Sequence, residues 1–267
     1  MQASVIISYY KNIPNLELML RALNRQSAIG NFEVIVSEDD DSPETISFLQ
    51  TLRPSMRFPI VHLSQEDMGF RKCKALNNAV RASSTDFLVF LDGDCVPHPE
   101  LVMEYIRKKA EGRVLYGRRV MLTESITQKV LSSKSFRALN LVQLVLAGCK
   151  RVEEGLYFTS IPASWKEKES GILLGCNMAM SKADLVSING FDEDYTSPGG
   201  GEDSDLEWRL MARGGVKFFS MRFKAIVYHL YHPERFSGEM EKRNNEILNS
   251  KIAQGHFFCK NGLTKPA

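Results

Sequence analysis

Short apolar runs alternate with segments of helical periodicity along roughly the first hundred residues of the chain. Predicted strands cover residues 4–10, 32–38, 59–64 and 87–91, and predicted helices cover residues 14–26, 43–52 and 71–83. In the first helix Leu16, Leu20 and Leu23 share one face, and Ser42 and Pro43 suit the start of the second. Repeated strand–helix units predict an α/β fold with a mostly parallel, doubly wound sheet and helices on both faces.

The pattern is less regular in the rest of the chain. We expect a helix at 99–110, a strand at 113–120 and one or two helices within 125–148. A charged, loop-like stretch surrounds Trp165, and a later helical pattern places Leu206 and Leu210 on one face. No linker-like segment separates residues 1–120 from residues 121–267, so the two halves are predicted to merge into one domain.

Composition places the chain among ordinary globular proteins. Its 267 residues are 43% hydrophobic and 25% charged, and a formal net charge of +2 gives no reason to expect nucleic acid as a partner. Five scattered cysteines without a CxxC pair indicate reduced thiols. A strand that begins almost at the first residue, together with the lack of a long apolar run, predicts a cytoplasmic protein without a targeting segment or membrane span.

Two carboxylates follow the most apolar of the predicted strands. The run from Phe87 to Leu91 leads directly into Asp92 and Asp94, which are separated only by Gly93. Alternate residues of an extended chain point the same way, so these two side chains repel unless a cation lies between them. The pattern predicts a site for a hard divalent cation, with a solvated turn as the simpler alternative. Neither a P-loop nor a GxGxxG turn occurs, which argues against kinases and nicotinamide-dependent dehydrogenases.

Four segments resemble, in order and spacing, the first part of family 2 glycosyltransferases. They are SVIISYYKN (4–12), RALNRQS (21–27), FEVIVSEDDDSPET (32–45) and GFRKCKALNNAVRASSTDFLVFLDGDCVPHP (69–99). The resemblance implies the GT-A glycosyltransferase fold and a UDP-sugar as donor. It implies that Ser8 and Asp39 contact the uridine, that Arg71 pairs with phosphate, and that Asp92 and Asp94 form the Asp-x-Asp motif.

Two departures from the family pattern occur beside these residues. Glu38 stands where the first acid of the second strand is usually Asp, and Asp40-Asp41 stand where Gly-Ser is usual. The resemblance also implies that residues 1–120 form the half that binds the nucleotide-sugar donor. Residues 121–267 become the acceptor-binding and catalytic half.

A second resemblance covers residues 175–210, GCNMAMSKADLVSINGFDEDYTSPGGGEDSDLEWRL. This segment is similar to the C-terminal part of galactosyltransferases, including bacterial chondroitin-polymerase-type modules, although the tryptophan that often precedes the glycines is missing. The resemblance implies that Asp203 is the catalytic base, favoured over Asp205 or a carboxylate that only stabilises a helix start. It also implies that Glu202 and Trp165 bind the acceptor.

Two histidines near the end of a late strand are candidates for the remaining metal ligands. Metal-dependent members of the fold place a histidine there, and His229 and His232 are nearly equal candidates, with His229 slightly favoured. The expected ion is Mn²⁺ or Mg²⁺, held by Asp94, Asp92 and one of the histidines, where it would neutralise the leaving diphosphate.

The expected activity is transfer of a sugar from a UDP-sugar, with inversion, to a saccharide or lipid-linked acceptor. The resemblance places this activity in surface polysaccharide or lipopolysaccharide assembly. Two alternatives remain. The first is a haloacid-dehalogenase-type phosphatase, because the segment FLVFLDGDCV also resembles the nucleophile motif of that class. The second is a catalytically inactive sugar-nucleotide binding module. The basic, amphipathic stretch 129–151 fits a core helix better than the alternative, a peripheral contact with the inner face of a membrane.

Overall fold

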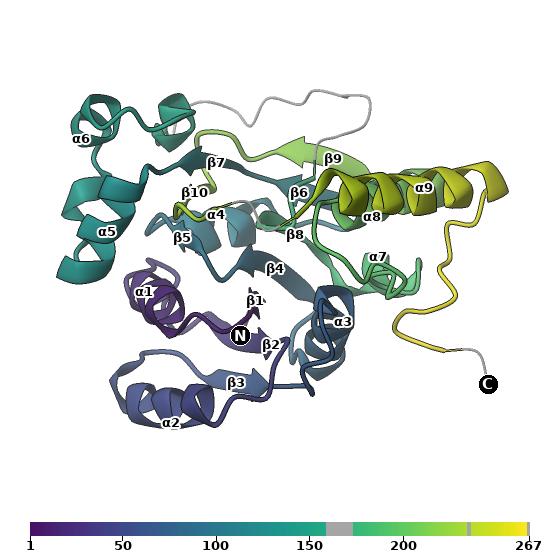
Figure 1. Cartoon of the computed structure of the whole chain (residues 1–267), viewed down its shortest axis with the longest axis horizontal. Helices are drawn as coiled ribbons and strands as arrows, with labels where there is room; N and C mark the ends of the chain where they lie inside the picture. The colour runs from purple at the N-terminus through teal and green to yellow at the C-terminus, as the bar shows by residue number, and fades with distance from the viewer. Residues whose placement is uncertain (159–172, 234–235, 266–267) are drawn as a thin grey trace.

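Seven strands form one sheet in the computed structural model, in the order β3-β2-β1-β4-β8-β6-β9 (Figure 1). They are β1 (Ala3–Tyr9), β2 (Phe32–Glu38), β3 (Ile60–Leu63), β4 (Phe87–Asp92), β6 (Arg113–Tyr116), β8 (Asn177–Ser181) and β9 (Lys217–Ser220). Only β8 runs antiparallel to its neighbours in this sheet, so the predicted mostly parallel α/β architecture is confirmed. The structure describes residues 1–158, 173–233 and 236–265.

Helices cover both faces of this sheet. One face packs against α1 (Ile13–Leu23), α2 (Pro43–Leu52) and α4 (Leu101–Lys108), and the other against α3 (Lys72–Ala82), α7 (Lys182–Val186) and α8 (Glu202–Arg213). Alternate residues of each central strand supply the two cores, as Val5 and Ile7 do on one side and Ile6 on the other. The long helix α9 (Gly238–Gln254) lies beside α8 (Figure 1).

Three further strands form a second, smaller sheet. It has the order β5-β10-β7, formed by β5 (Cys95–Pro97), β10 (Ile226–His229) and β7 (Arg118–Met121). The single strand predicted at 113–120 is therefore wrong, because Gly117 divides it between two sheets. A Cβ atom at Gly117 would lie 2.0 Å from Nδ2 of Asn177, so only glycine lets the chain pass this close.

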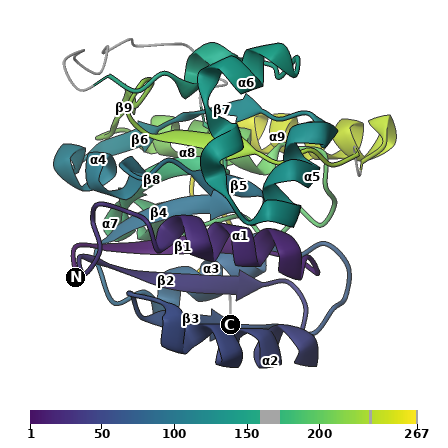
Figure 2. The same ribbon diagram turned by 90° about the vertical axis from the view of Figure 1, so that its left-hand side faces the viewer.

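An excursion from the small sheet contains α5 (Glu124–Ser133), the short 3₁₀ helix η2 (Phe136–Leu139) and α6 (Leu141–Leu146). It faces the viewer in Figure 2, together with α1. Val130 and Leu144 are buried against β7 and β10, as expected of core helices, but most of the α6 surface is exposed. Among the described helices, none is both long enough and apolar enough to cross a bilayer.

Candidate active site

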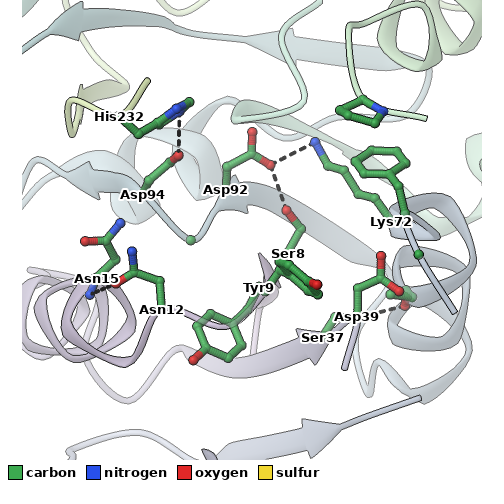
Figure 3. A pocket seen from close by; sticks show the side chains of 16 residues that line it. Ser8, Tyr9, Asn12, Asn15, Ser37, Asp39, Lys72, Asp92, Asp94 and His232 are labelled. Atoms are coloured by element: carbon green, nitrogen blue, oxygen red, sulfur yellow. Dashed lines mark hydrogen bonds and ion pairs between the residues drawn. The ribbon is translucent and has the colours of Figure 1, made fainter. Parts of the chain in front are cut away.

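Three candidate metal ligands converge where the two sheets meet. Asp94 follows β4, His229 ends β10 and His232 lies just beyond it. The Nε2 atom of His232 is 3.2 Å from Oδ2 of Asp94, and Nε2 of His229 is 3.7 Å from Oδ1 (Figure 3 draws Asp94 and His232). One ligand atom from each residue lies within 4.8 Å of the others. Both histidines, rather than one of them, therefore lie at the aspartate.

The small sheet holds this cluster together. The backbone N–H of Leu230 donates to the carbonyl oxygen of Asp94 at 2.9 Å, and His229 pairs with Cys95 in the antiparallel β5–β10 ladder. Segments that are far apart in sequence are thereby fixed at ligand distance before any ion binds. Such preorganisation reduces the conformational cost of coordination.

The protonation states of the cluster suit a cation. Burial would raise the pKa of Asp94, but the hydrogen bond from His232 and the charges of the two histidines hold it at about 2. Burial lowers the pKa of His229 in spite of the nearby Asp94 carboxylate. At neutral pH the group offers a carboxylate and a neutral imidazole, which are the forms that bind metals.

The donor set fits a divalent ion. The Nδ1 atom of His229 is buried and has no hydrogen-bond partner among the residues that the structure describes. One oxygen ligand and two nitrogen ligands suit Mn²⁺ better than Mg²⁺, which prefers oxygen ligands throughout. The residues present therefore fit the divalent metal ion that the sequence predicts.

Asp92 points to a different partner. Its Oδ1 atom accepts a hydrogen bond from Ser8 Oγ at 2.8 Å and lies 3.0 Å from Nζ of Lys72 (Figure 3). The predicted role of Asp92 as a direct metal ligand stays a prediction, because the three-residue cluster does not include it. The cation that balances Asp92 in this structure is a lysine ammonium.

A cavity of about 370 Å³ opens at the carboxyl ends of β1, β2 and β4. Five of the predicted site residues line it, namely Ser8, Asp39, Asp92, Asp94 and His232. Ligands of open α/β sheets bind at this edge, so the location agrees with the expectation from sequence. Figure 3 shows these side chains surrounding the hollow.

Asp39 is fixed within the cavity wall. It accepts hydrogen bonds from Nε2 of Gln65 and from the backbone N–H of Arg71, both at 2.6 Å. Burial raises the pKa of Asp39 against the lowering effect of these two bonds. Each carboxylate oxygen keeps a second lone pair, so the side chain can still accept from a bound ligand.

Arg71 does not line the cavity, whereas its neighbour Lys72 does. The Arg71 guanidinium donates to the carbonyl oxygen of Glu66, outside the hollow. Lys72 lies 3.6 Å from Oε1 of Glu202 as well as beside Asp92, and these charges raise its pKa despite burial. Sequence reasoning missed Lys72. The sequence does show a second cation directly after Arg71, at the start of the predicted helix. Which of the two side chains faces the cavity depends on the rotation of the helix about its axis, and the sequence does not determine that rotation.

Asp203 lies in the first turn of α8. Its Oδ2 atom accepts from the backbone N–H of Gly175 at 2.7 Å. Burial raises the pKa of Asp203 to about 7, and the charge of Glu202 adds to this, while Lys72 opposes it. Glu202 is itself buried, and its Oε2 atom has no hydrogen-bond partner in the described ranges. A carboxyl with a pKa near neutrality is suited to proton transfer.

Asp205 has a structural environment instead. It is fully buried and pairs with Nε of Arg209 at 2.7 Å, and Arg209 also donates to the carbonyl oxygens of Ile188 and Gly190. A carboxylate engaged in this way serves the fold, which argues against the Asp205 alternative. Trp165, the other predicted acceptor contact, lies outside the residues that the structure describes.

The glycine loop before α8 is held by a helix that the sequence analysis did not predict. Asn244 of α9 is buried, and its Nδ2 atom donates to the carbonyl oxygens of Ser197 and Gly200 at 3.0 and 2.7 Å. Its Oδ1 atom accepts from Ser197 Oγ at 2.9 Å. Gly201 has a φ of +97°, so the loop takes a backbone path that other residues rarely adopt.

The sheet and the acidic cavity at its edge together have the arrangement of a GT-A glycosyltransferase. Solved structures confirm the fold. Staphylococcus aureus TarS 1–349 matches with a TM-score of 0.61 at 17% identity, covering 94% of this chain and 65% of that one. The mannosyltransferase PcManGT from Pyrobaculum calidifontis, solved with GDP-Man and Mn²⁺, matches with a TM-score of 0.61 at 15% identity, covering 95% and 64%.

The chain belongs to glycosyl transferase family 2, whose family model matches residues 4–186. A second model, described as the N-terminal domain of galactosyltransferase, matches residues 158–233. Both predicted resemblances are thereby confirmed, and the chain is a glycosyltransferase. The phosphatase alternative is excluded by this family membership.

Curated relatives agree with the assignment. The validoxylamine A glucosyltransferase of Streptomyces hygroscopicus subsp. jinggangensis (strain 5008) is 27% identical over 232 residues, or 79% of this chain and 51% of the relative. The chondroitin synthase of Escherichia coli is 29% identical over 245 residues, or 86% of this chain and 35% of the relative. The chain thus spans about half or less of the length of these relatives.

Proposed function

We propose that this chain is an inverting, metal-dependent glycosyltransferase that uses a UDP-sugar. The observation that carries the proposal is the cluster of Asp94, His229 and His232, of which Asp94 and His232 line the same cavity as Ser8 and Asp39. TarS has been solved with UDP and with UDP-GlcNAc, and PcManGT with GDP-Man and Mn²⁺, which supports a nucleotide-sugar donor and a divalent ion.

In this proposal the donor end of the cavity recognises the nucleotide. Asp39 accepts from uracil N3–H, and Ser8, at the end of β1, contacts the base or the ribose. Asp94, His229 and His232 hold Mn²⁺ or Mg²⁺, which supplies Lewis-acid stabilisation of the leaving diphosphate when bound. Asp92 completes the site either through the ribose or through water on the ion.

The phosphate contact predicted for Arg71 moves to Lys72 in the proposal. The Lys72 ammonium already lines the cavity, whereas Arg71 would have to release the Glu66 carbonyl to reach it. A buried lysine can pair with a donor phosphate as a point charge, as lysines do in other nucleotide sites. Arg71 keeps a role through its backbone N–H, which orients Asp39.

Asp203 is the proposed general base. The acceptor hydroxyl must lose its proton as the bond to the leaving group breaks, and a carboxylate within hydrogen-bond reach accepts it. Glu202, one residue earlier, is proposed to hold the acceptor together with Trp165. Because the pKa of Asp203 is about 7, turnover should fall as the pH drops below neutrality and the base becomes protonated.

The acceptor is proposed to be a saccharide or a lipid-linked saccharide in surface polysaccharide or lipopolysaccharide assembly. The similarity to chondroitin synthase, a polymer-forming enzyme by its name, supports this class. A location of the protein in the cytoplasm accords with this proposal. For a lipid-linked acceptor, the location would be the inner face of the membrane.

A donor screen tests the proposed function against an inactive binding module. Each UDP-sugar is incubated with the chain and Mn²⁺, and released UDP is measured with and without excess EDTA. Slow, metal-dependent UDP release from at least one donor is expected. Calorimetric binding of UDP-sugars without any release, even with saccharide acceptors present, would favour the inactive module instead.

A further inference from the structure

Helix α6 presents an apolar surface to solvent. Leu141, Val142, Val145 and Leu146 are 42%, 67%, 60% and 82% exposed, while Leu144 on the opposite side is buried. Side chains at these spacings share one face of a helix, so the four form a contiguous stripe. A stripe of this kind on the outside of a folded protein marks a contact surface.

The chain around this stripe is positively charged. Residues 129–151 contain five lysines and arginines and no acidic residue. A groove of about 540 Å³ beside η2, which directly precedes α6, is lined by Arg21, Arg25, Lys134 and Arg137. Glu17 pairs with Arg21 and Lys134, both at 2.8 Å. This one carboxylate faces four cations, so the groove keeps a net positive charge.

The stripe and the groove belong to the same side of the molecule. Figure 2 shows α1, α5 and α6 on the side facing the viewer, and Arg21 of α1 and Arg137 of η2 line the same groove. Val186, another exposed valine, is in α7, which lies on the other side of the molecule from α6 in Figure 1. The excursion that carries the stripe starts beside β10, where Met121 pairs with His229.

We propose that α6 and the adjacent basic groove dock on an anionic lipid bilayer. Val142, Val145 and Leu146 enter the interfacial layer, and the groove cations contact lipid phosphates. An exposed apolar helix face beside a groove in which cations outnumber acids has the chemistry of an interfacial segment. This inference goes beyond the proposed sugar transfer and can hold or fail separately from it.

Vesicle co-sedimentation of the full chain tests the proposal. Vesicles of phosphatidylcholine alone are compared with vesicles of phosphatidylcholine and phosphatidylglycerol, at low and high salt. Binding is expected only with phosphatidylglycerol and should weaken at high salt. The double variant Arg25→Gln/Arg137→Gln should weaken binding about fivefold for each cation lost. The double variant Val145→Ser/Leu146→Ser should weaken it by about tenfold or more, because less apolar surface enters the lipid.

Val186→Ser is the matched control, since Val186 is 53% exposed, close to the 60% of Val145, and lies away from α6. This variant should bind vesicles like the wild type. Calorimetric UDP binding in every variant separates docking from donor recognition, and it should not change. Absence of wild-type binding to anionic vesicles, or binding that survives both double variants, overturns the proposal. A dimer that dissociates in Val145→Ser/Leu146→Ser without any lipid binding also overturns it, by assigning the stripe to a second copy of the chain.

Discussion

Replacing Asp203 with Asn should stabilise the folded protein at alkaline pH. Burial and the charge of Glu202 raise the pKa of this carboxyl to about 7, so the folded chain keeps a proton that the unfolded chain has released. For a carboxyl with a raised pKa, the unfolding free energy is highest below the unfolded pKa. It falls as the pH rises towards the folded pKa. The Asn side chain does not titrate, so the unfolding free energy of the variant does not decrease in this pH range.

The magnitude follows from the two pKa values. An unperturbed aspartate titrates at about 3.9, and each pH unit between the two values corresponds to ~1.4 kcal/mol, so the full effect is ~4 kcal/mol. Asn also gives up the favourable interaction of an anion with the α8 N-terminus, worth ~0.3–1 kcal/mol. Its Oδ1 atom can still accept from the Gly175 N–H. We therefore expect a net gain of ~3 kcal/mol at about pH 8 and no gain at about pH 4.

Urea denaturation at a series of pH values measures this difference. Ser204→Ala is the control, because Ser204 is exposed on the same helical turn and carries no charge. Its difference from the wild type should be small at every pH. The same Asn variant should bind UDP normally but turn over ~10²–10⁴-fold more slowly, the usual contribution of a general base.

Two results would refute the reasoning. A stability difference that does not change with pH would mean that this carboxyl titrates normally in the folded state. A loss of stability at alkaline pH would mean that ionised Asp203 is favourable where it lies, for example through Lys72. Near-normal turnover in the variant would instead transfer the role of base to Glu202.

Three further predictions concern the cavity. Asp94→Asn should weaken Mn²⁺ binding by at least about tenfold in calorimetry, since it removes the only anionic ligand of the cluster; full activity in excess EDTA would rule out the metal. In calorimetry, the wild type should bind UDP more tightly than ADP or GDP, and Asp39→Asn should reduce this preference for UDP. Equal affinities of the wild type for the three nucleotides would contradict the uracil contact assigned to Asp39. Lys72→Met should move the acidic limb of the pH–turnover profile to higher pH, because Lys72 lowers the pKa of Asp203, and an unmoved limb would show that the two are not coupled.

The first four strands could be predicted from sequence because they are short apolar runs that alternate with helical patterns. Strands β1, β2 and β4 bury both faces, whereas β3 is only partly buried. Strand β8 gave no such signal. Its sequence, NMAMS, has no β-branched residue, and its place between β4 and β6 depends on pairing with distant strands. Helix α9 was missed for a related reason, since Asn244 is its only fully buried residue and an apolar period is lacking.

The site was predictable as far as strand ends determine it. Ser8, Asp39, Asp92 and Asp94 all follow or end parallel strands, and the rule that ligands bind at this edge brought them together. Which side chain faces the cavity at a helix start depends on rotation about the helix axis, and here Lys72 rather than Arg71 lines the cavity. The phosphate contact of Arg71 stays a prediction. The joint placement of His229 and His232 depends on the small sheet, which no local pattern announces.

The β-bridge between Met121 and Lys150 closes the base of the segment that contains α5 and α6. Their backbones donate to each other at 2.9 and 3.0 Å, so the excursion through α5 and α6 leaves and returns at one place. Loop-closure free energy changes slowly with length, and a shorter turn or a different insert could join the same two ends. A replacement segment that also covers β7 and β10, as Val130 and Leu144 do now, would therefore leave the ladder that aligns His229 with Asp94 in place.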